Sequence, residues 1–458
     1  MNDEFRTEKD SMGEVQVPQD ALYGAQTQRA LNNFTIGDLT MSPVFIRALA
    51  VIKRAAAQTN QELGLLRRQE GEAIAAAAQE IINGNHGEHF PVPVFQTGSG
   101  TSSNMNINEV IVGLAARQGV ELSANDHVNR GQSSNDVIPT ALHLAIALGL
   151  KGQVIPVLQQ LAEVIRGQAA RYSQVIKTGR TNLMDALPIR FGAELEAWAA
   201  GLDECLERFE TLLPRIQRLA LGGTAVGSGL NTHADFPAKA VARINSMTGL
   251  QCRVAPNLYK GLSFLDSVVE ASGQLRAAAL VLTKISNDLR WMNSGPGAGL
   301  AEIALPALQP GSSIMPAKVN PVIPEAVMMA CAQIMGNDQV VALAARNGNF
   351  QLNTMLPLAA HNILQAIDLL SDSARTLADK AIAGLVVNEE KCREFVSRNP
   401  ILVTALNNKI GYLAAAEIGK KAMAEQRPIL EVALEETDLS REQLEELLDP
   451  ARLADGGK

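Results

Sequence analysis

The chain has 458 residues, with 40 lysines and arginines against 48 aspartates and glutamates and a formal net charge of −8. One hydrophobic core rarely grows beyond about 250–300 residues, so we expect two or three domains. The charge gives no support for binding nucleic acid, because affinity for a polyanion depends mainly on clustered basic residues. Hydrophobic residues make up 47% of the chain but aromatic residues only 4%, which favours helices rich in alanine and leucine.

The cysteines and the N-terminal segment indicate a reducing compartment. The four cysteines are far apart and form no CxxC pair, so we expect thiols rather than disulfides or a zinc site: Cys205, Cys252, Cys331 and Cys392. The N-terminal string MNDEFRTEKDSMGE has no apolar core of a signal peptide. We also expect no stretch to be apolar for long enough to cross a bilayer, and therefore a cytoplasmic protein without a membrane partner.

The first forty residues are expected to be loop with a short hairpin, because turn formers recur through them. A helix should begin at Ser42 and Pro43, a favoured N-cap and first-turn pair. A second helix is predicted from about 68 to 82, ending at the Asn83-Gly84 turn signal.

The middle of the chain shows the longest helical periodicity. Three long helices are predicted over residues 137–175, from near Pro188, and over 265–291, and Pro156 should kink the first of them. Two further helices should lie near 322–346 and 356–384. Several of these are apolar over most of their circumference, which requires burial on more than one side. We therefore expect an obligate oligomer built on a long helical bundle.

These elements predict a mainly α fold in three parts. An N-terminal domain with mixed structure should span 1–132, the central helical bundle 133–387 and a small helical C-terminal domain 388–458.

Four polar segments separate the helices: QTGSGTSSNMN at 96–106, GQSSND at 131–136, GGTAVGSG at 222–229 and GSSIMPAKVN at 311–320. Their glycines do not indicate a phosphate loop, because that motif follows a strand and commonly ends in Gly-Lys-Ser/Thr. We therefore predict no nucleotide site.

The six histidines do not predict a metal centre. Only His86 and His89 are close in sequence, and no cysteine accompanies them, so we expect two exposed loop residues. His143 lies on an apolar predicted helix and is expected to be a hydrogen-bonded core residue. The sequence therefore predicts no metal.

The polar segments, with Thr181, offer compact hydrogen-bond donors and one cation: Ser99, Thr101, Ser133, Ser134, Asn135, Thr181, Ser312, Ser313, Lys318 and Asn320. Such donors suit a small dicarboxylate, and loops that open helices add the positive end of the helix dipole. Composition alone leaves open the alternative that each segment is only a polar connector.

The signature-like string GSSIMPAKVNPVIPE at 311–325 resembles that of the aspartase/fumarase superfamily. Similar blocks occur in order over nearly the whole chain, including QTGSGTSSNMNINEV at 96–110 and LALGGTAVGSGLNTH at 219–233. TGSGT at 97–101 and ALNNKIGYLAAAEIGKKA near the C-terminus resemble class II fumarases more than aspartases. The second part of the 311–325 string, PAKVNPVIPE, resembles fumarases and aspartases equally.

The resemblance implies reversible hydration of fumarate to L-malate, a step of the tricarboxylic acid cycle, without metal or organic cofactor. It implies a homotetramer whose sites are shared between three subunits. Ser312 is implied as the general base that removes the C3 proton of malate, from a mobile loop that closes over the substrate. The resulting aci-carboxylate would be held by donors that include Gly100 and by the groups Ser99, Thr101, Ser133, Ser134, Asn135, Thr181, Ser313, Lys318 and Asn320.

The sequence departs from the fumarase pattern at Asn182. Fumarases usually read GRTHLQDA, whereas this chain reads GRTNLMDA. The family histidine pairs with a glutamate that corresponds to Glu325 and passes a proton to or from water, which an amide cannot do near neutral pH. Three explanations stay open: a re-routed proton path, an altered version of a histidine enzyme, or another substrate.

A second departure lies at VELSAND, residues 120–126. Fumarases typically carry arginine and histidine there, in a secondary dicarboxylate site, where this chain has Val120 and Ser123. Only Asn125 and Asp126 are retained, so we predict a weak or absent secondary site at Ser123, Asn125 and Asp126.

Two other functions remain as alternatives. One is ammonia-lyase activity on aspartate or another C4 dicarboxylate, which the amide at 182 motivates. The other is a non-catalytic structural relative, against which the retention of Ser312, Lys318 and Asn320 together speaks.

Overall fold

The structure, a computed structural model, describes residues 4–457 and is mainly helical, as expected. Its contacts divide the chain into two units. Unit 1 comprises Met1–Pro156, Cys205–Ala279 and Cys331–Ser371, and unit 2 comprises Val157–Glu204, Leu280–Ala330 and Asp372–Lys458. Both units are discontinuous in sequence, and the three-part division stays a prediction.

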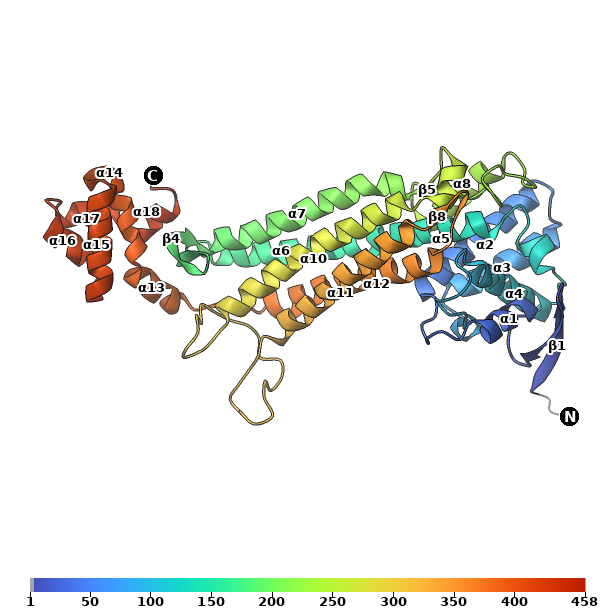
Figure 1. Ribbon diagram of the computed structural model, residues 1–458, viewed down its shortest axis with the longest axis horizontal. Coiled ribbons are helices and arrows are strands. Elements are labelled where there is room, and N and C mark those ends of the chain that lie inside the picture. Colours follow the sequence, from blue (N-terminus) through green and yellow to red (C-terminus); the bar gives the residue numbers. More distant parts are fainter. Residues whose placement is uncertain (1–3, 458) are drawn as a thin grey trace. The chain divides into compact units, whose positions relative to one another are not determined.

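The N-terminal part of unit 1 begins with an antiparallel hairpin, as expected, of strands β1 (Phe5–Asp10) and β2 (Gly13–Pro18). The helix α1 (Ala25–Asn33) follows where only loop was expected. Figure 1 shows α1 grouped with the helices that come next in the chain: α2 (Pro43–Glu62), α3 (Arg68–Ile82), α4 (Thr101–Arg117) and α5 (Ser134–Gly149), with the short turns η1 (Gly87–His89) and η2 (Ala124–Val128) between them.

The boundaries of α2 and α3 confirm the predicted signals. The Ser42 side chain accepts a hydrogen bond from the Val44 N–H at 3.3 Å, and Pro43 is the first helical residue, where its missing N–H costs nothing. The last helical residue of α3 is Ile82, followed by Asn83.

The long helices occur where periodicity predicted them, with two differences. The first is interrupted by a π-helical segment, η3 (Leu150–Val154), just before Pro156, because proline lacks the N–H that an α-helix needs there. The second begins at Phe191 rather than near Pro188, because the residues before it form a strand. The remaining bounds are α6 (Ile155–Arg171), α7 (Phe191–Ile216), α10 (Asp266–Met292), α11 (Val322–Ala345), α12 (Leu356–Leu377) and η4 (Ala378–Ile382).

The expectation that no stretch is apolar enough to cross a bilayer was wrong by length and composition. The continuous helical stretch Ser134–Arg171 and helix α11 both meet that criterion. Buried core helices of soluble proteins meet it as well, and most of the apolar window in Ser134–Arg171 is buried. In α11 the side chains of Met329 and Leu343 are 69% and 55% exposed.

Short strand pairs and small helices complete the two units. Unit 1 also holds α8 (Phe236–Thr248), α9 (Leu258–Ser263), the parallel pair β5 (Arg218–Leu219) and β6 (Arg253–Val254), and the antiparallel pair β8 (Gly348–Asn349) and β9 (Leu352–Asn353). Unit 2 holds the antiparallel pairs β3 (Ile176–Thr181) with β4 (Met184–Arg190) and β7 (Ile303–Ala304) with β10 (Val386–Val387).

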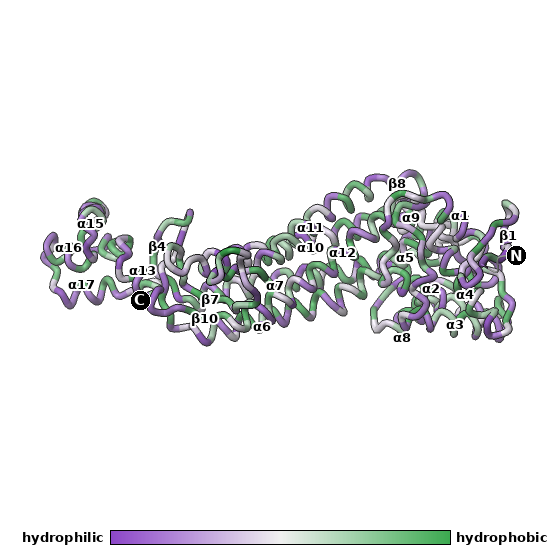
Figure 2. Tube along the Cα trace, turned by 90° about the horizontal axis from the view of Figure 1, so that it is seen from below, coloured by the Kyte–Doolittle hydropathy of each residue, from purple (hydrophilic) through white to green (hydrophobic). Residues whose placement is uncertain are grey.

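The C-terminal part of unit 2 has a hydrophobic core of its own. Leu406, Val432, Ala433 and Leu444 are fully buried in it, and hydrophobic and hydrophilic residues alternate along its helices (Figure 2). The helices of the C-terminal part are α13 (Glu389–Arg398), η5 (Pro400–Leu406), α14 (Asn407–Ile410), α15 (Tyr412–Glu425), α16 (Ile429–Glu436), α17 (Arg441–Leu447) and α18 (Pro450–Ala454).

The cysteines behave as expected, whereas His143 is hydrogen-bonded as expected but only half-buried. All four cysteines are buried thiols. His143 lies on α5 and donates from Nδ1 to the Arg218 carbonyl at 3.0 Å.

Candidate functional site

The glycines at 98 and 100 allow close packing at the start of α4. A Cβ on Gly98 would lie 1.6 Å from the carbonyl oxygen of Thr354, which is impossible without moving the backbone. Gly100 has a φ of 74° and a Cβ there would lie 2.9 Å from the side chain of Ile138. Close packing therefore explains these two glycines.

Ser99 and Thr101 form a pair of hydroxyls at the N-terminus of α4. Their side-chain oxygens lie 2.9 Å apart, and Thr101 is the first residue of the helix. The Gln96 side chain accepts from the Ser103 N–H at 3.0 Å and donates to the Pro93 carbonyl at 2.7 Å, so the loop is fixed on both sides. Both hydroxyls lie where the helix dipole favours an anion.

The next group of predicted donors opens α5. Ser133 is the N-cap, and its hydroxyl accepts from the Asn135 N–H at 3.2 Å. Asn104, fully buried on α4, donates to the hydroxyl of Ser134 at 3.1 Å. Asn135 donates to the Ala225 carbonyl at 2.8 Å. The structure therefore brings three of the four polar segments together in unit 1.

Two buried residues of opposite charge, Asp136 and Lys53, support these loops through hydrogen bonds. Asp136 accepts from the backbone N–H groups of Ser133, Gly222 and Thr224, each at 2.9 Å. Burial raises the pKa of its carboxyl, and the three N–H donors and Lys53 oppose that rise.

Lys53 is fully buried and donates to Asn129 and Gln132 at 3.1 and 3.0 Å. Burial lowers the pKa of its ammonium, and the charge of Asp136 opposes this. The pair thus ties the 131–136 and 222–225 segments to α2.

The predicted residues Thr181 and Asn182 lie at the tip of the β3–β4 hairpin in unit 2. Thr181 pairs with Met184. Between them Asn182 and Leu183 have φ values of 55° and 62°, both left-handed, as a two-residue type I′ turn requires. Asparagine is favoured at the first position of such a turn, so residue 182 suits its backbone.

The hairpin is anchored by a buried ion network. Lys177 lies 2.7 Å from Glu194 and 3.0 Å from Glu302, and Arg180 lies 2.9 Å from Glu302. Glu302 is fully buried. Burial disfavours the Lys177 ammonium, but the two carboxylates outweigh that cost and raise its pKa. The turn that carries Asn182 is therefore held by the ion pairs of Lys177 and Arg180, which lie five and two residues before it in the chain.

Ser312 lies in the 311–320 segment of unit 2, and two backbone N–H groups donate to its hydroxyl. Its Oγ accepts from the N–H groups of Ile314 and Met315 at 3.3 and 3.1 Å. The Gly311 N–H donates to the Lys318 carbonyl at 2.8 Å and closes the loop. Such donors favour a charged oxygen over a neutral one, which is what a serine base needs.

Three further predicted site residues lie in the same loop, Ser313, Lys318 and Asn320, and Glu325 follows it in the chain. Lys318 donates to Asn320, and Asn320 donates to the Gly311 carbonyl at 2.9 Å. Both line a cavity of about 970 Å³ together with Glu325, in the first turn of α11. Ser313 is exposed. Within residues 4–457 no hydrogen bond joins Asn182 to Glu325.

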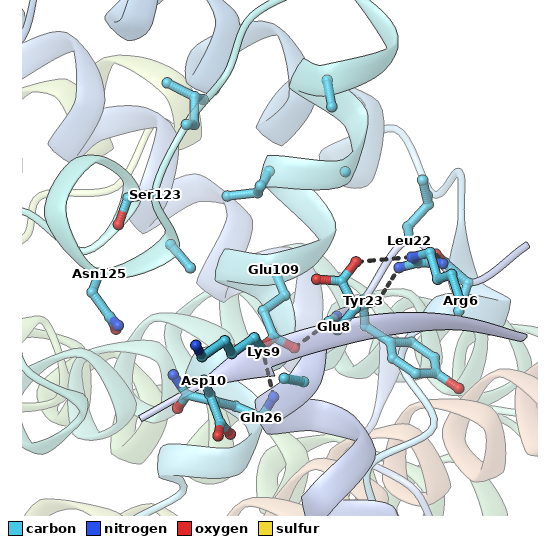
Figure 3. A pocket seen from close by; sticks show the side chains of 18 of the residues that line it. Arg6, Glu8, Lys9, Asp10, Leu22, Tyr23, Gln26, Glu109, Ser123 and Asn125 are labelled. Carbon is cyan, nitrogen blue, oxygen red and sulfur yellow. Dashed lines mark hydrogen bonds and ion pairs between the residues drawn. The ribbon is translucent and has the colours of Figure 1, made fainter. Parts of the chain in front are cut away.

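The doubtful secondary-site residues lie beside another cavity, of about 590 Å³, in unit 1. Ser123 and Asn125 line it, and Figure 3 shows them at one side with Arg6 at the other and Glu109 between. The carboxylate of Asp126 accepts a hydrogen bond from the hydroxyl of Ser123 at 2.9 Å.

One of the three cations that line the cavity, Arg6, is held by the backbone, whereas Lys9 and Arg117 line it as well. Arg6 donates to the carbonyl groups of Pro18, Gln19, Ala21 and Tyr23. With Arg6 occupied in this way and Asp126 adding negative charge, a weak secondary site stays our prediction.

Sequence reasoning missed three supporting residues: Lys53, Asn104 and Asp136. A signal for Asp136 was present, because Ser133-x-x-Asp136 is a capping-box pattern. Lys53 and Asn104 had no such signal, since a single polar residue on a helix does not reveal whether it is buried.

Comparison with known proteins gives consistent relatives along the whole chain. A family model described as "Lyase" matches residues 13–336, and one described as "Fumarase C C-terminus" matches residues 402–455. A Pseudomonas aeruginosa protein named fumarate hydratase class II 2 is 53% identical over 453 residues, covering 99% of each chain. The Mycobacterium tuberculosis fumarate hydratase class II is 48% identical over 455 residues, covering 98% of this chain and 96% of its own.

A solved structure gives the same result for the fold. The crystal structure of class II fumarase from Schistosoma mansoni superposes with a TM-score of 0.97 at 38% identity, covering 99% of this chain and 100% of its own. With sequence and fold in agreement over nearly every residue, this chain belongs to the class II fumarase family of lyases.

Proposed function

We propose that the chain is a fumarate hydratase that interconverts fumarate and L-malate. The observation that carries the proposal is the setting of Ser312, whose Oγ accepts from two backbone N–H groups inside a polar loop. The full-length similarity to proteins named fumarate hydratase class II supports the same reaction.

In the dehydration direction the Ser312 alkoxide takes the C3 proton of malate and becomes a hydroxyl. The electron pair of the broken C–H bond moves into the adjacent carboxylate and gives a dianionic aci-carboxylate. Lys318 and Asn320, with the hydroxyls and N–H groups at the starts of α4 and α5, would stabilise that charge. The C2 hydroxyl then leaves as water with a proton, and the double bond forms.

Asn182 can hold the water by hydrogen bonds but cannot deliver its proton. Since the amide cannot supply the proton, we propose that the proton comes by a route that does not include residue 182. Glu325 is the titratable candidate from the family pattern.

We also propose a cytoplasmic homotetramer that needs no cofactor and serves the tricarboxylic acid cycle. The exposed apolar side chains of Leu280, Met329 and Leu343, on α10 and α11, support burial between copies of the chain. In such an assembly the donors of unit 1 and the loop of unit 2 come from different copies.

The test is fumarate formation, followed by ultraviolet absorbance, from L-malate and separately from L-aspartate. We expect turnover of malate and none of aspartate. If the protein converted only aspartate, its function would be that of an ammonia-lyase rather than a hydratase. The amide at residue 182 favours that alternative. Sedimentation of the same sample tests the tetramer.

A further inference from the structure

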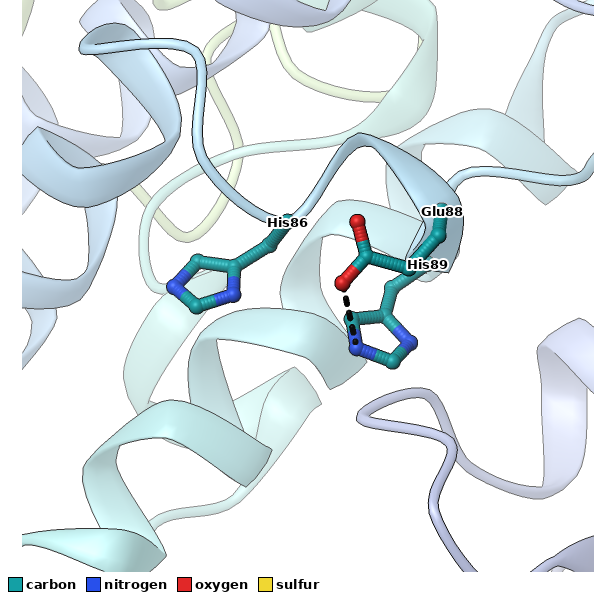
Figure 4. A group of neighbouring side chains, drawn as sticks. All are labelled: His86, Glu88 and His89. Carbon is teal, nitrogen blue, oxygen red and sulfur yellow. Dashed lines mark ion pairs between the residues drawn. The ribbon is translucent and has the colours of Figure 1, made fainter.

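Two histidines and a glutamate meet in unit 1 at the turn between α3 and α4. The ligand atoms of His86, Glu88 and His89 all lie within 4.8 Å of one another, and Figure 4 shows the three side chains facing a common space. The sequence-based expectation of two exposed histidines was wrong, because the His86 and His89 side chains are only 20% and 14% exposed. The sequence argument also overlooked Glu88 as a third ligand.

A fourth side chain orients the first histidine. Nε2 of His86 lies 2.7 Å from a carboxylate oxygen of Glu80, in the last turn of α3. The carboxylate accepts, so Nε2 carries the hydrogen and the lone pair of the neutral ring is on Nδ1. A carboxylate behind a histidine is the arrangement that commonly supports metal ligands.

The backbone around the cluster is also constrained. His86 has a φ of 67°, in the left-handed region that few non-glycine residues adopt. The carbonyl of His89 accepts from the buried Asn106 of α4 at 3.0 Å. Both ligand positions are therefore set by the fold rather than by a freely moving loop.

The His89 ring is suited to be a ligand. Its Nε2 lies 3.3 Å from a carboxylate oxygen of Glu88. Its Nδ1 accepts a long hydrogen bond from the Leu22 N–H at 3.4 Å, and this contact has to break for Nδ1 to carry the proton when Nε2 binds a metal.

We propose that His86 Nδ1, Glu88 and His89 Nε2 bind one Zn²⁺ ion, with water completing the coordination. Two imidazoles and one carboxylate suit zinc and its neighbours, whereas calcium and magnesium prefer all-oxygen sites. Zinc bonds of about 2.0–2.1 Å put tetrahedral ligand atoms about 3.3 Å apart, so small side-chain rotations close the cluster. Glu88 is 71% exposed, which leaves an open face for the ion to enter.

Bound Zn²⁺ would stabilise the turn at residues 86–89, which lies between α3 and the loop at 96–101 in the chain. The ion has no part in the proposed chemistry.

The test is calorimetric titration of tag-free, chelator-treated protein with Zn²⁺. We expect one ion per chain. His86→Asn, which tolerates the left-handed backbone, and His89→Asn should each weaken binding by more than about 100-fold. Glu80→Gln, which alters only the support of His86, should weaken it by about 10–100-fold.

Two controls keep the result interpretable. His233→Ala removes an exposed histidine elsewhere and should leave Zn²⁺ binding unchanged. The exposed Glu88→Gln should weaken binding without lowering the melting temperature, which separates loss of a ligand from loss of fold. Absence of stoichiometric binding, or binding that both histidine variants leave intact, would overturn the proposal. The readout does not use activity, so it is independent of the proposed function.

Discussion

The donors at the starts of α4 and α5 and the 311–320 loop differ in how they are held. The first group is fixed: Gly98 packs against the Thr354 carbonyl, Asn104 joins the two helices, and Asp136 accepts three N–H groups. The loop relies on its own backbone, and Ile314 is 84% exposed.

This difference fits two different tasks. A binding site for two carboxylates gains from donors that are already in place, because no ordering has to occur when the substrate binds. A base that must reach the substrate and exclude water gains from a segment that can close. We therefore expect stability to depend on the first group and chemistry on the second.

The largest expected effect on stability comes from a matched pair of lysines, one in each region. Lys53→Met leaves the buried Asp136 without its nearby cation and should lower the unfolding free energy by about 3–5 kcal/mol. Lys318→Met, on the exposed loop, should change it by less than about 0.5 kcal/mol. Denaturant unfolding measures both, and equal losses would contradict the comparison.

A smaller effect is expected from a pair of glycines. Gly98→Ala forces a Cβ against the Thr354 carbonyl and should cost about 1–3 kcal/mol or more, with weaker substrate binding because Ser99 and Thr101 move with it. Gly297→Ala, whose Cβ would meet no atom within 4 Å, should be nearly neutral. Melting temperatures and the KM for malate measure both effects. If Gly98→Ala changed neither, the loop would not be tightly packed.

The smallest effect is expected at residue 182. Asn182→His should change the turnover of malate by less than about tenfold, because the proton is proposed to take another route. Asn182→Gly keeps the left-handed turn but removes the amide, and should lower turnover by about tenfold through a lost hydrogen bond. A rise of about 100-fold or more in Asn182→His would instead mark the asparagine as a lesion.

The sequence predicted the fold well where periodicity and caps agree, as at Ser42-Pro43 and along α10. It missed α1 and the β3–β4 hairpin, because short elements carry few residues on which a period can be read. The candidate donors were identified by residue type and resemblance. The buried residues that hold these donors in place were not identified, because the burial of Lys53 and Asn104 depends on contacts between segments far apart in the chain.

The most direct test of the proposed division between fixed binding groups and a base on a closing loop is Ser312→Ala, studied by both turnover and calorimetric binding of L-malate. We predict that turnover falls by about 10²–10⁴-fold, while the dissociation constant changes by less than about tenfold and the melting temperature is unchanged. Turnover close to that of the unaltered chain would remove Ser312 from the role of base. A loss of binding as large as the loss of turnover would show that the serine holds the substrate instead.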